Sequence, residues 1–133
     1  MRKLRVYMAG AYVDAERLVG VKRRMQEIGF EVTSRWIGKA AAGKPYESDF
    51  SDEAKVDYAD IDKADFLIID TFGKTRGGRE WEGGYAIGKG KRVMVVGPVI
   101  HPFHAMCRLR FPDWEAALAY LAQRLEHGDV RED

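Results

Sequence analysis

The sequence predicts an α/β protein with a doubly wound, flavodoxin-like (Rossmann-like) sheet of about five mainly parallel strands flanked by helices. Short runs of β-branched and aromatic residues alternate along the chain with segments whose apolar residues recur at helical spacing. The connections between these segments are mostly short, which favours right-handed crossovers and helices on both faces of the sheet. A length of 133 residues is typical of one domain, so we expect a single domain over residues 1–133.

The first part of the chain is expected to form a strand, a helix and a second strand. Residues 4–9 are apolar and predict a buried strand. A helix is expected between Asp14, its N-cap, and Gly29, with inward residues Leu18, Val21, Met25 and Ile28. Residues 30–36 are rich in β-branched and aromatic types and predict the second strand. Residues 38–50 are then expected to form a long loop, either a binding lid or a surface excursion.

The rest of the chain continues the same alternation. Strands are expected at residues 66–69, 92–96 and 107–111. Helices are expected from residue 51, over residues 79–89 and from Pro112. The residues expected to face the sheet from the first of these helices are Ala54, Tyr58, Ile61 and Ala64, and from the last Trp114, Leu118, Leu121 and Leu125. The charged end after His127 is expected to fray.

Composition argues against several classes of function. A formal net charge of +1 gives no electrostatic reason to expect binding to a nucleic acid polymer or a membrane surface. No apolar run approaches the roughly 18 residues needed to span a bilayer, and residues 1–3 lead directly into a strand, so we expect a cytoplasmic protein. The single cysteine, Cys107, has no histidine at a metal-site spacing and is expected to be a small buried residue.

In a doubly wound sheet, ligands bind beyond the carboxyl ends of the strands. The most informative segment expected at that edge is TRGGREWEGGYAIGKGK, residues 75–91, in which a glycine-rich loop runs into a helix. Glycines such as Gly78 and the free N–H groups of a helix start suit a phosphate or a sugar oxygen. Lys74, Arg76 and Arg79 add positive charge there. A glycine-rich turn is also common as plain loop geometry, so this segment alone does not decide the function.

Two carboxylates are expected to face inward near this edge. Glu82 shares a helix face with Tyr85 and Ala86, and Asp57 lies on the same helical stripe as Ile61. A carboxylate on an apolar face costs free energy unless a ligand or partner uses it. Such a pair suits glycosidic bond cleavage, in which one group attacks the anomeric carbon and the other handles the proton. Glu80 is expected to face solvent or to form an ion pair. Asp60, Asp62 and Asp65 are expected on the helix surface or in a turn at the helix end.

Three stretches of the chain resemble the nucleoside 2-deoxyribosyltransferase family and its relatives that hydrolyse nucleotide N-glycosidic bonds. They are AGAY after the first strand, DYADIDKADFLIID, and GGREWEGGYAIGKGKRVMVVG. The centre of the resemblance is Glu82-Gly83-Gly84-Tyr85-Ala86, which fits the family's Glu-x-Gly-Tyr-Ala around the nucleophile. Asp57 fits the family's second acidic position by its spacing.

The resemblance implies a role for each matching residue. Glu82 would form a covalent deoxyribosyl intermediate with the assistance of Tyr7, and Asp57 would protonate or position the departing base. Gly10 and Tyr12 fall where the family lines its pocket. The resemblance further implies a homodimer or higher homo-oligomer, a small-molecule nucleoside or nucleotide as substrate, and no metal or organic cofactor. Aromatic residues that would stack on or border the base are Trp36 and either Phe103 or His104.

One residue departs from the family pattern. Six residues before the nucleophile, the transferases commonly carry an acid that helps to hold the sugar, whereas this chain has Arg76. An arginine beside a glycine-rich helix start suits a 5′-phosphate. Three functions therefore stay open: a 2-deoxyribosyltransferase, a deoxynucleoside 5′-monophosphate N-glycosidase, and a nucleotide-binding sensor without turnover.

Overall fold

The protein is described by a computed structural model for residues 2–43 and 50–126. Its sheet has the strand order β2-β1-β3-β4-β5, with every neighbouring pair parallel. This is the flavodoxin-like order, so the predicted fold class is confirmed. The strands are β1 (Arg5–Ala9), β2 (Glu31–Val32), β3 (Phe66–Asp70), β4 (Arg92–Val96) and β5 (Arg110–Phe111). The predicted strands at residues 4–9, 66–69 and 92–96 match β1, β3 and β4 to within one residue at either end.

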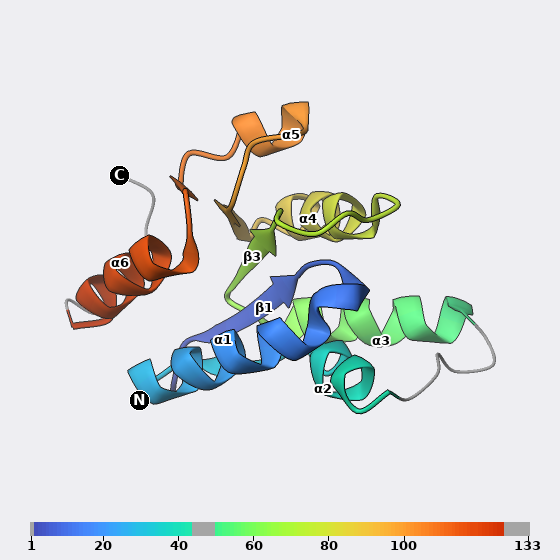
Figure 1. The fold of residues 1–133 in the computed structure, drawn as a ribbon, viewed down its shortest axis with the longest axis horizontal. Helices are drawn as coiled ribbons and strands as arrows, with labels where there is room; N and C mark the ends of the chain where they lie inside the picture. Colours follow the sequence, from blue (N-terminus) through green and yellow to red (C-terminus); the bar gives the residue numbers. More distant parts are fainter. Residues whose placement is uncertain (1, 44–49, 127–133) are drawn as a thin grey trace.

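Helices cover both faces of the sheet (Figure 1). On one face α1 contacts α6, and on the other α3 contacts α4. The helical segments are the 3-10 turn η1 (Tyr12–Asp14), α1 (Ala15–Ile28), α2 (Trp36–Ala41), α3 (Phe50–Lys63), α4 (Gly78–Gly88), α5 (Pro102–Ala105) and α6 (Trp114–Glu126). No helix in the described part of the chain is long and apolar enough to cross a membrane.

The central strands and the inner helix faces form the core. All five residues of β3 are buried, as are four of the five in β1 and in β4. Helix α1 buries the predicted Leu18, Val21 and Met25 and ends at Gly29, whose φ of 126° only glycine adopts readily. Helix α6 likewise buries Trp114, Leu118 and Leu121. Cys107 is buried, as expected. The predicted fraying after His127 lies outside the described residues.

The second predicted strand is wrong beyond Val32. The chain leaves the sheet there because the Ser34 hydroxyl accepts the backbone N–H of Met8, in place of a ladder hydrogen bond. Trp36 then begins α2, so the predicted loop over residues 38–50 is also wrong at its start, where residues 38–41 are helical. Residues 44–49 of that prediction lie outside the described residues. The fifth strand is shorter than predicted, at Arg110–Phe111.

The inward face of α3 is more polar than the sequence pattern indicated. Ala54 is exposed, whereas Glu53, Asp60, Ile61 and Ala64 are buried. Asp60, which we expected on the surface or at a helix end, is 1% exposed. Its carboxylate accepts the backbone N–H of Arg35 at 3.0 Å and the Arg35 Nε at 2.9 Å. This pair, in which Asp60 is buried and Arg35 is exposed, fixes the start of α2 against α3, and both helices contribute to the site described below.

Candidate active site

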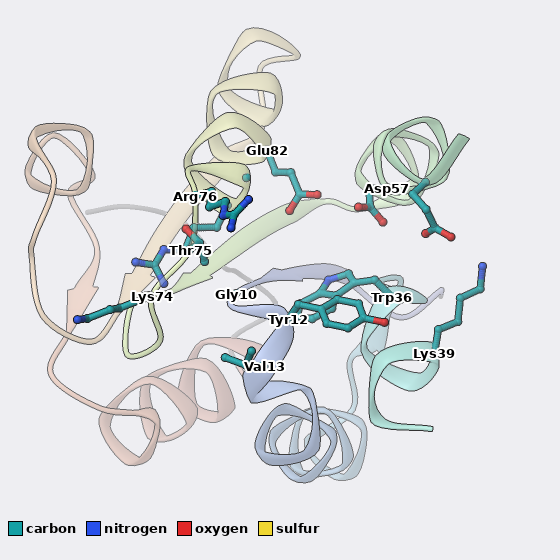
Figure 2. Close-up of a pocket in the computed structure, with 13 residues that line it drawn as sticks. Gly10, Tyr12, Val13, Trp36, Lys39, Asp57, Lys74, Thr75, Arg76 and Glu82 are labelled. Atoms are coloured by element: carbon teal, nitrogen blue, oxygen red, sulfur yellow. The ribbon is translucent and has the colours of Figure 1, made fainter. Parts of the chain in front are cut away.

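The carboxyl edge of β1 and β3, together with the start of α4, encloses a cavity of about 430 Å³ (Figure 2). In open α/β sheets this is where ligands bind. The cavity is lined by Gly10, Tyr12, Val13, Trp36, Lys39, Glu53, Asp57, Lys74, Thr75, Arg76, Gly78, Arg79 and Glu82. Of the twelve residues to which the sequence analysis gave a site role, nine line this cavity. Tyr7 does not line it but hydrogen-bonds Glu82, and Phe103 and His104 lie elsewhere.

Glu82 and Asp57 face each other from two different helices. Figure 2 shows Glu82, from α4, directed toward Asp57, from α3. Tyr7 is a fully buried residue of β1, and its hydroxyl donates a hydrogen bond of 3.0 Å to Glu82 Oε2. Helix α4 can lie this close to the sheet because Gly83 has no Cβ: a Cβ there would come within 2.8 Å of Ile69 Cδ1. The glycine after Glu82 therefore sets the depth of the carboxylate.

Burial raises the pKa values of both acids. The pKa of Glu82 lies well above its usual range, mainly because the group is buried and secondly because of the charge of Asp57. Burial also raises the pKa of Asp57 to about 6. A hydrogen bond between the two carboxyl groups lowers the pKa of Asp57 and raises that of Glu82. We infer that the pair shares one proton near neutral pH.

One oxygen of the pair has no hydrogen bond. Asp57 Oδ1 is buried and has no hydrogen-bond partner among the described residues. A buried acceptor without a partner costs roughly 1–3 kcal/mol. In a cavity wall, such an atom is ready to hydrogen-bond a group on a bound molecule. Burial also raises the pKa of Tyr7 well above its usual range, so Tyr7 stays a hydrogen-bond donor to Glu82.

The opposite end of the cavity is positively charged. The loop before α4 supplies Lys74 and Arg76, which are both exposed and line the cavity. Helix α4 begins at Gly78, after Gly77 with φ of 103°, so the free N–H groups of its first turn lie at the same end. A phosphate or another anion would be stabilised there by both the side chains and the helix start.

Arg79 lines the cavity, but its guanidinium is already engaged. The side chain is 4% exposed, and Nη1 donates to the carbonyls of Asp70, at 3.2 Å, and Gly73. Its Nε donates to Glu80 at 2.8 Å. Arg79 therefore fixes the loop that carries Lys74 and Arg76, and the ion pair expected of Glu80 is present.

His104 does not line the cavity. It belongs to α5 and is 1% exposed, its Nε2 is 3.0 Å from Glu80 Oε2, and its Nδ1 accepts the N–H of Ile100. The expectation that His104 contacts substrate is wrong in this structure because a buried histidine bonded on both nitrogens is held as a structural group. Phe103 is 63% exposed and borders a neighbouring depression instead.

Aromatic rings form the wall of the cavity next to β1. Tyr12 and Trp36 stack with ring centres 6.4 Å apart and an interplanar angle of 25°. The indole Nε1 of Trp36 donates to the carbonyl of Met8 at 2.9 Å, so the ring is fixed to β1. Gly10 lies beneath, where an added Cβ would be 2.9 Å from Leu18. A planar ligand could lie against this wall.

The sequence interpretation missed Val13, Lys39, Glu53 and Thr75, which also line the cavity. A signal for Glu53 existed, because it precedes Asp57 by four residues and so shares its helix face. Lys39 fell in the segment that was interpreted as a loop. Among the described residues, no group of three His, Cys, Asp or Glu side chains is arranged to hold a metal ion.

Comparisons with known proteins identify the fold. No protein-family model matches the chain, and no curated protein sequence is significantly similar to it. Among solved structures, a 2-deoxyribosyltransferase from Bacillus psychrosaccharolyticus superposes with a TM-score of 0.70 at 20% identity, over 87% of this chain and 91% of that one. A CMP N-glycosidase from Clostridium botulinum superposes with a TM-score of 0.61 at 19% identity, over 90% and 98%.

The chain shares its fold with both enzymes. The resemblance drawn from the sequence motifs therefore extends to the arrangement of strands and helices along most of the chain. At this level of identity the comparison fixes the architecture and leaves the chemistry to the site itself.

Proposed function

We propose that this protein cleaves the N-glycosidic bond of a deoxynucleoside or deoxynucleotide, with Glu82 as the nucleophile. The observation that carries the proposal is the buried group Tyr7–Glu82–Asp57 at the carboxyl edge of the sheet. Two carboxyl groups with one shared proton can act as nucleophile and acid in the same step. The names of the two structural neighbours, a 2-deoxyribosyltransferase and a CMP N-glycosidase, are consistent with cleavage of an N-glycosidic bond.

The first step forms a glycosyl ester. The ionised Glu82 carboxylate attacks the anomeric carbon, the bond from that carbon to the base nitrogen breaks, and its electron pair goes to the base. Glu82 becomes ionised by passing the shared proton to Asp57, and Asp57 then gives that proton to the base as the base leaves. The Tyr7 hydroxyl bonds Glu82 Oε2 and so orients the carboxylate and leaves Oε1 for the attack.

The second step releases the sugar. A second base, or a water molecule, attacks the anomeric carbon, the ester bond breaks and Glu82 is again a carboxylate. Asp57 takes the proton of the incoming group, which restores the starting state. With a base the reaction is a transfer of the 2-deoxyribosyl group, which is the leading form of the proposal, and with water it is a hydrolysis.

The positively charged end of the cavity favours a second form of the function, the hydrolysis of a deoxynucleoside 5′-monophosphate. Lys74, Arg76 and the start of α4 lie where a 5′-phosphate would be neutralised. Arg76 also stands where the transferases commonly carry an acid. A nucleotide sensor without turnover is the remaining alternative, and it would bind the same monophosphates without breaking the bond.

The proposal includes a single domain, a cytoplasmic location and a homodimer or higher oligomer, none of which affects the chemistry above. The experiment that tests the function incubates the protein with deoxynucleosides and their 5′-monophosphates, with and without a free acceptor base, and separates the products. A new nucleoside formed only with acceptor identifies the transferase. Free base from monophosphates without acceptor identifies the hydrolase, and binding of monophosphates with no product identifies the sensor.

A further inference from the structure

A third carboxylate lines the cavity and has no part in the steps above. Glu53 lies on α3, one helical turn before Asp57, and its side chain shares the same helix face. It is 9% exposed and lines the cavity. Burying a carboxylate is costly unless hydrogen bonds compensate it. Neither the nucleophile nor the acid of the proposed reaction requires this group.

The three carboxylates follow one another along the cavity. The C-terminal half of α3 packs on α4, where Tyr58 stacks on Tyr85 with ring centres 3.8 Å apart and the Tyr85 hydroxyl donates to Asp62. Glu53 lies on the opposite side of Asp57 from this contact, about 6 Å farther along the helix axis. The order from the anomeric position outward is therefore Glu82, Asp57, Glu53. Glu53 is therefore the carboxylate of the three that lies toward the far edge of a bound base.

The chemistry of this end of the cavity selects the kind of group it can bind. An ionised carboxylate only accepts hydrogen bonds, and its two oxygens offer about four acceptor positions. Glu53 also has other interactions within the protein, and a carboxylate can accept a hydrogen bond from a ligand in addition to such interactions. Asp57 Oδ1 is a second acceptor, buried and without a partner among the residues that the structure describes. A ligand group that hydrogen-bonds the ionised Glu53 must therefore be a donor, such as an N–H group.

The positive charge of Lys39 lies beside the carboxyl groups of Glu53 and Asp57 and offsets part of their negative charge. Lys39, from α2, lines the same part of the cavity, and its charge lowers the pKa of Asp57, whereas the charge of Glu53 raises it. Figure 2 shows Lys39 extending from α2 toward α3. The aromatic wall of Tyr12 and Trp36 completes this end with flat surfaces.

From this arrangement, we propose that Glu53 is a specificity residue that accepts a hydrogen bond from the exocyclic amino group on the far edge of the base. The proposal rests on the proposed function, and it deepens that function by naming the substrate class. Substrates are nucleosides or nucleotides of cytosine or adenine, which carry this amine. Their oxo counterparts, uracil and hypoxanthine, place a carbonyl oxygen against the carboxylate and are rejected, because two acceptors face each other without a proton between them.

The test compares matched substrate pairs that differ only in that group. Deoxycytidine is compared with deoxyuridine, and deoxyadenosine with deoxyinosine, each also as the 5′-monophosphate. We expect kcat/KM to favour the amino member of each pair by about tenfold or more. In Glu53→Gln, whose amide can donate to a carbonyl, this ratio should fall about tenfold, mainly because the oxo substrates improve. The matched control is Asp52→Asn, a neighbouring carboxylate with a 61% exposed side chain, which should leave the ratio unchanged.

A second measurement separates the failure of this inference from the failure of the proposed function. Calorimetric titration of the wild-type protein with free cytosine, uracil, adenine and hypoxanthine requires no turnover. Tighter binding of the amino bases, lost in Glu53→Gln, would support the inference even if no substrate were cleaved. Cleavage or binding with equal preference for amino and oxo bases, or a preference that Glu53→Gln leaves unchanged, would overturn it. A melting temperature of Glu53→Gln close to that of the wild type establishes that the variant is folded.

Discussion

The burial of the Asp57 carboxyl group at the centre of the site should be measurable as a loss of stability. Asp57 has a folded-state pKa of about 6 against an ordinary value of 3.8. Because the folded protein binds this proton more tightly than the unfolded chain, the free energy of unfolding falls as the pH rises between these two values. The cost is absent below about pH 4 and is complete above about pH 6.

Substitution of Asp57 by Asn should remove that cost. A shift of roughly two pKa units corresponds to ~3 kcal/mol as an upper bound. Asp57 is only partly buried and opens onto the cavity, so solvent screening reduces the expected gain to about 1–2 kcal/mol. For a chain of this length, such a gain raises the melting temperature by roughly 3–8 °C.

The assay is thermal and urea unfolding of the wild type and of Asp57→Asn at about pH 8 and about pH 4, the two sides of the titration. The gain should be present at the higher pH and absent at the lower. Asp52→Asn, on the exposed side of the same helix, should change stability by less than about 0.5 kcal/mol at either pH. A variant that is less stable than the wild type at the higher pH, or equally more stable at both, would refute the reasoning.

Three further predictions concern activity. Glu82→Gln should lower turnover by about 10³-fold or more while circular dichroism shows an intact fold, because the lost group is chemical; wild-type turnover would remove Glu82 as nucleophile. Tyr7→Phe should move the acidic limb of the kcat/KM profile to higher pH. In the wild type the hydrogen bond from Tyr7 lowers the pKa of Glu82, so its loss raises that pKa. An unchanged limb would show that Tyr7 has no influence on the nucleophile. Arg76→Ala should raise KM for 5′-monophosphates and leave KM for nucleosides unchanged, and equal effects on both substrate classes would exclude phosphate recognition by Arg76. Arg79→Ala should mainly lower the melting temperature, because Arg79 donates hydrogen bonds to the carbonyls of Asp70 and Gly73.

Much of the fold follows from local patterns in the sequence. The buried strands β1, β3 and β4 are continuous apolar runs, and the spacing of apolar residues in α1 and α6 identified their buried faces. The same helical spacing predicted that Asp57 and Glu82 face inward, because the spacing of residues along a helix determines which of them share a face.

What the sequence did not predict depends on contacts between distant segments. Trp36 begins a helix because the side chain of Ser34 bonds to β1 and Arg35 is held by Asp60. The burial of Asp60 depends on the same contact. His104 turns inward because Glu80, on another helix, offers it a carboxylate. The spacing of residues within one segment cannot predict these hydrogen-bond partners, because each partner belongs to an element that is distant in the sequence.

The proposed mechanism requires a covalent bond between Glu82 and the sugar. The most direct measurement is intact-protein and peptide mass spectrometry after reaction with a 2′-fluorinated deoxynucleoside or its 5′-monophosphate, in which the fluorine slows the second step more than the first. We predict a mass increase equal to one fluorodeoxyribosyl group or its phosphate, located on the peptide that contains Glu82 and absent in Glu82→Gln. Release of the base from this substrate with no adduct, or an adduct on another residue, would contradict the mechanism.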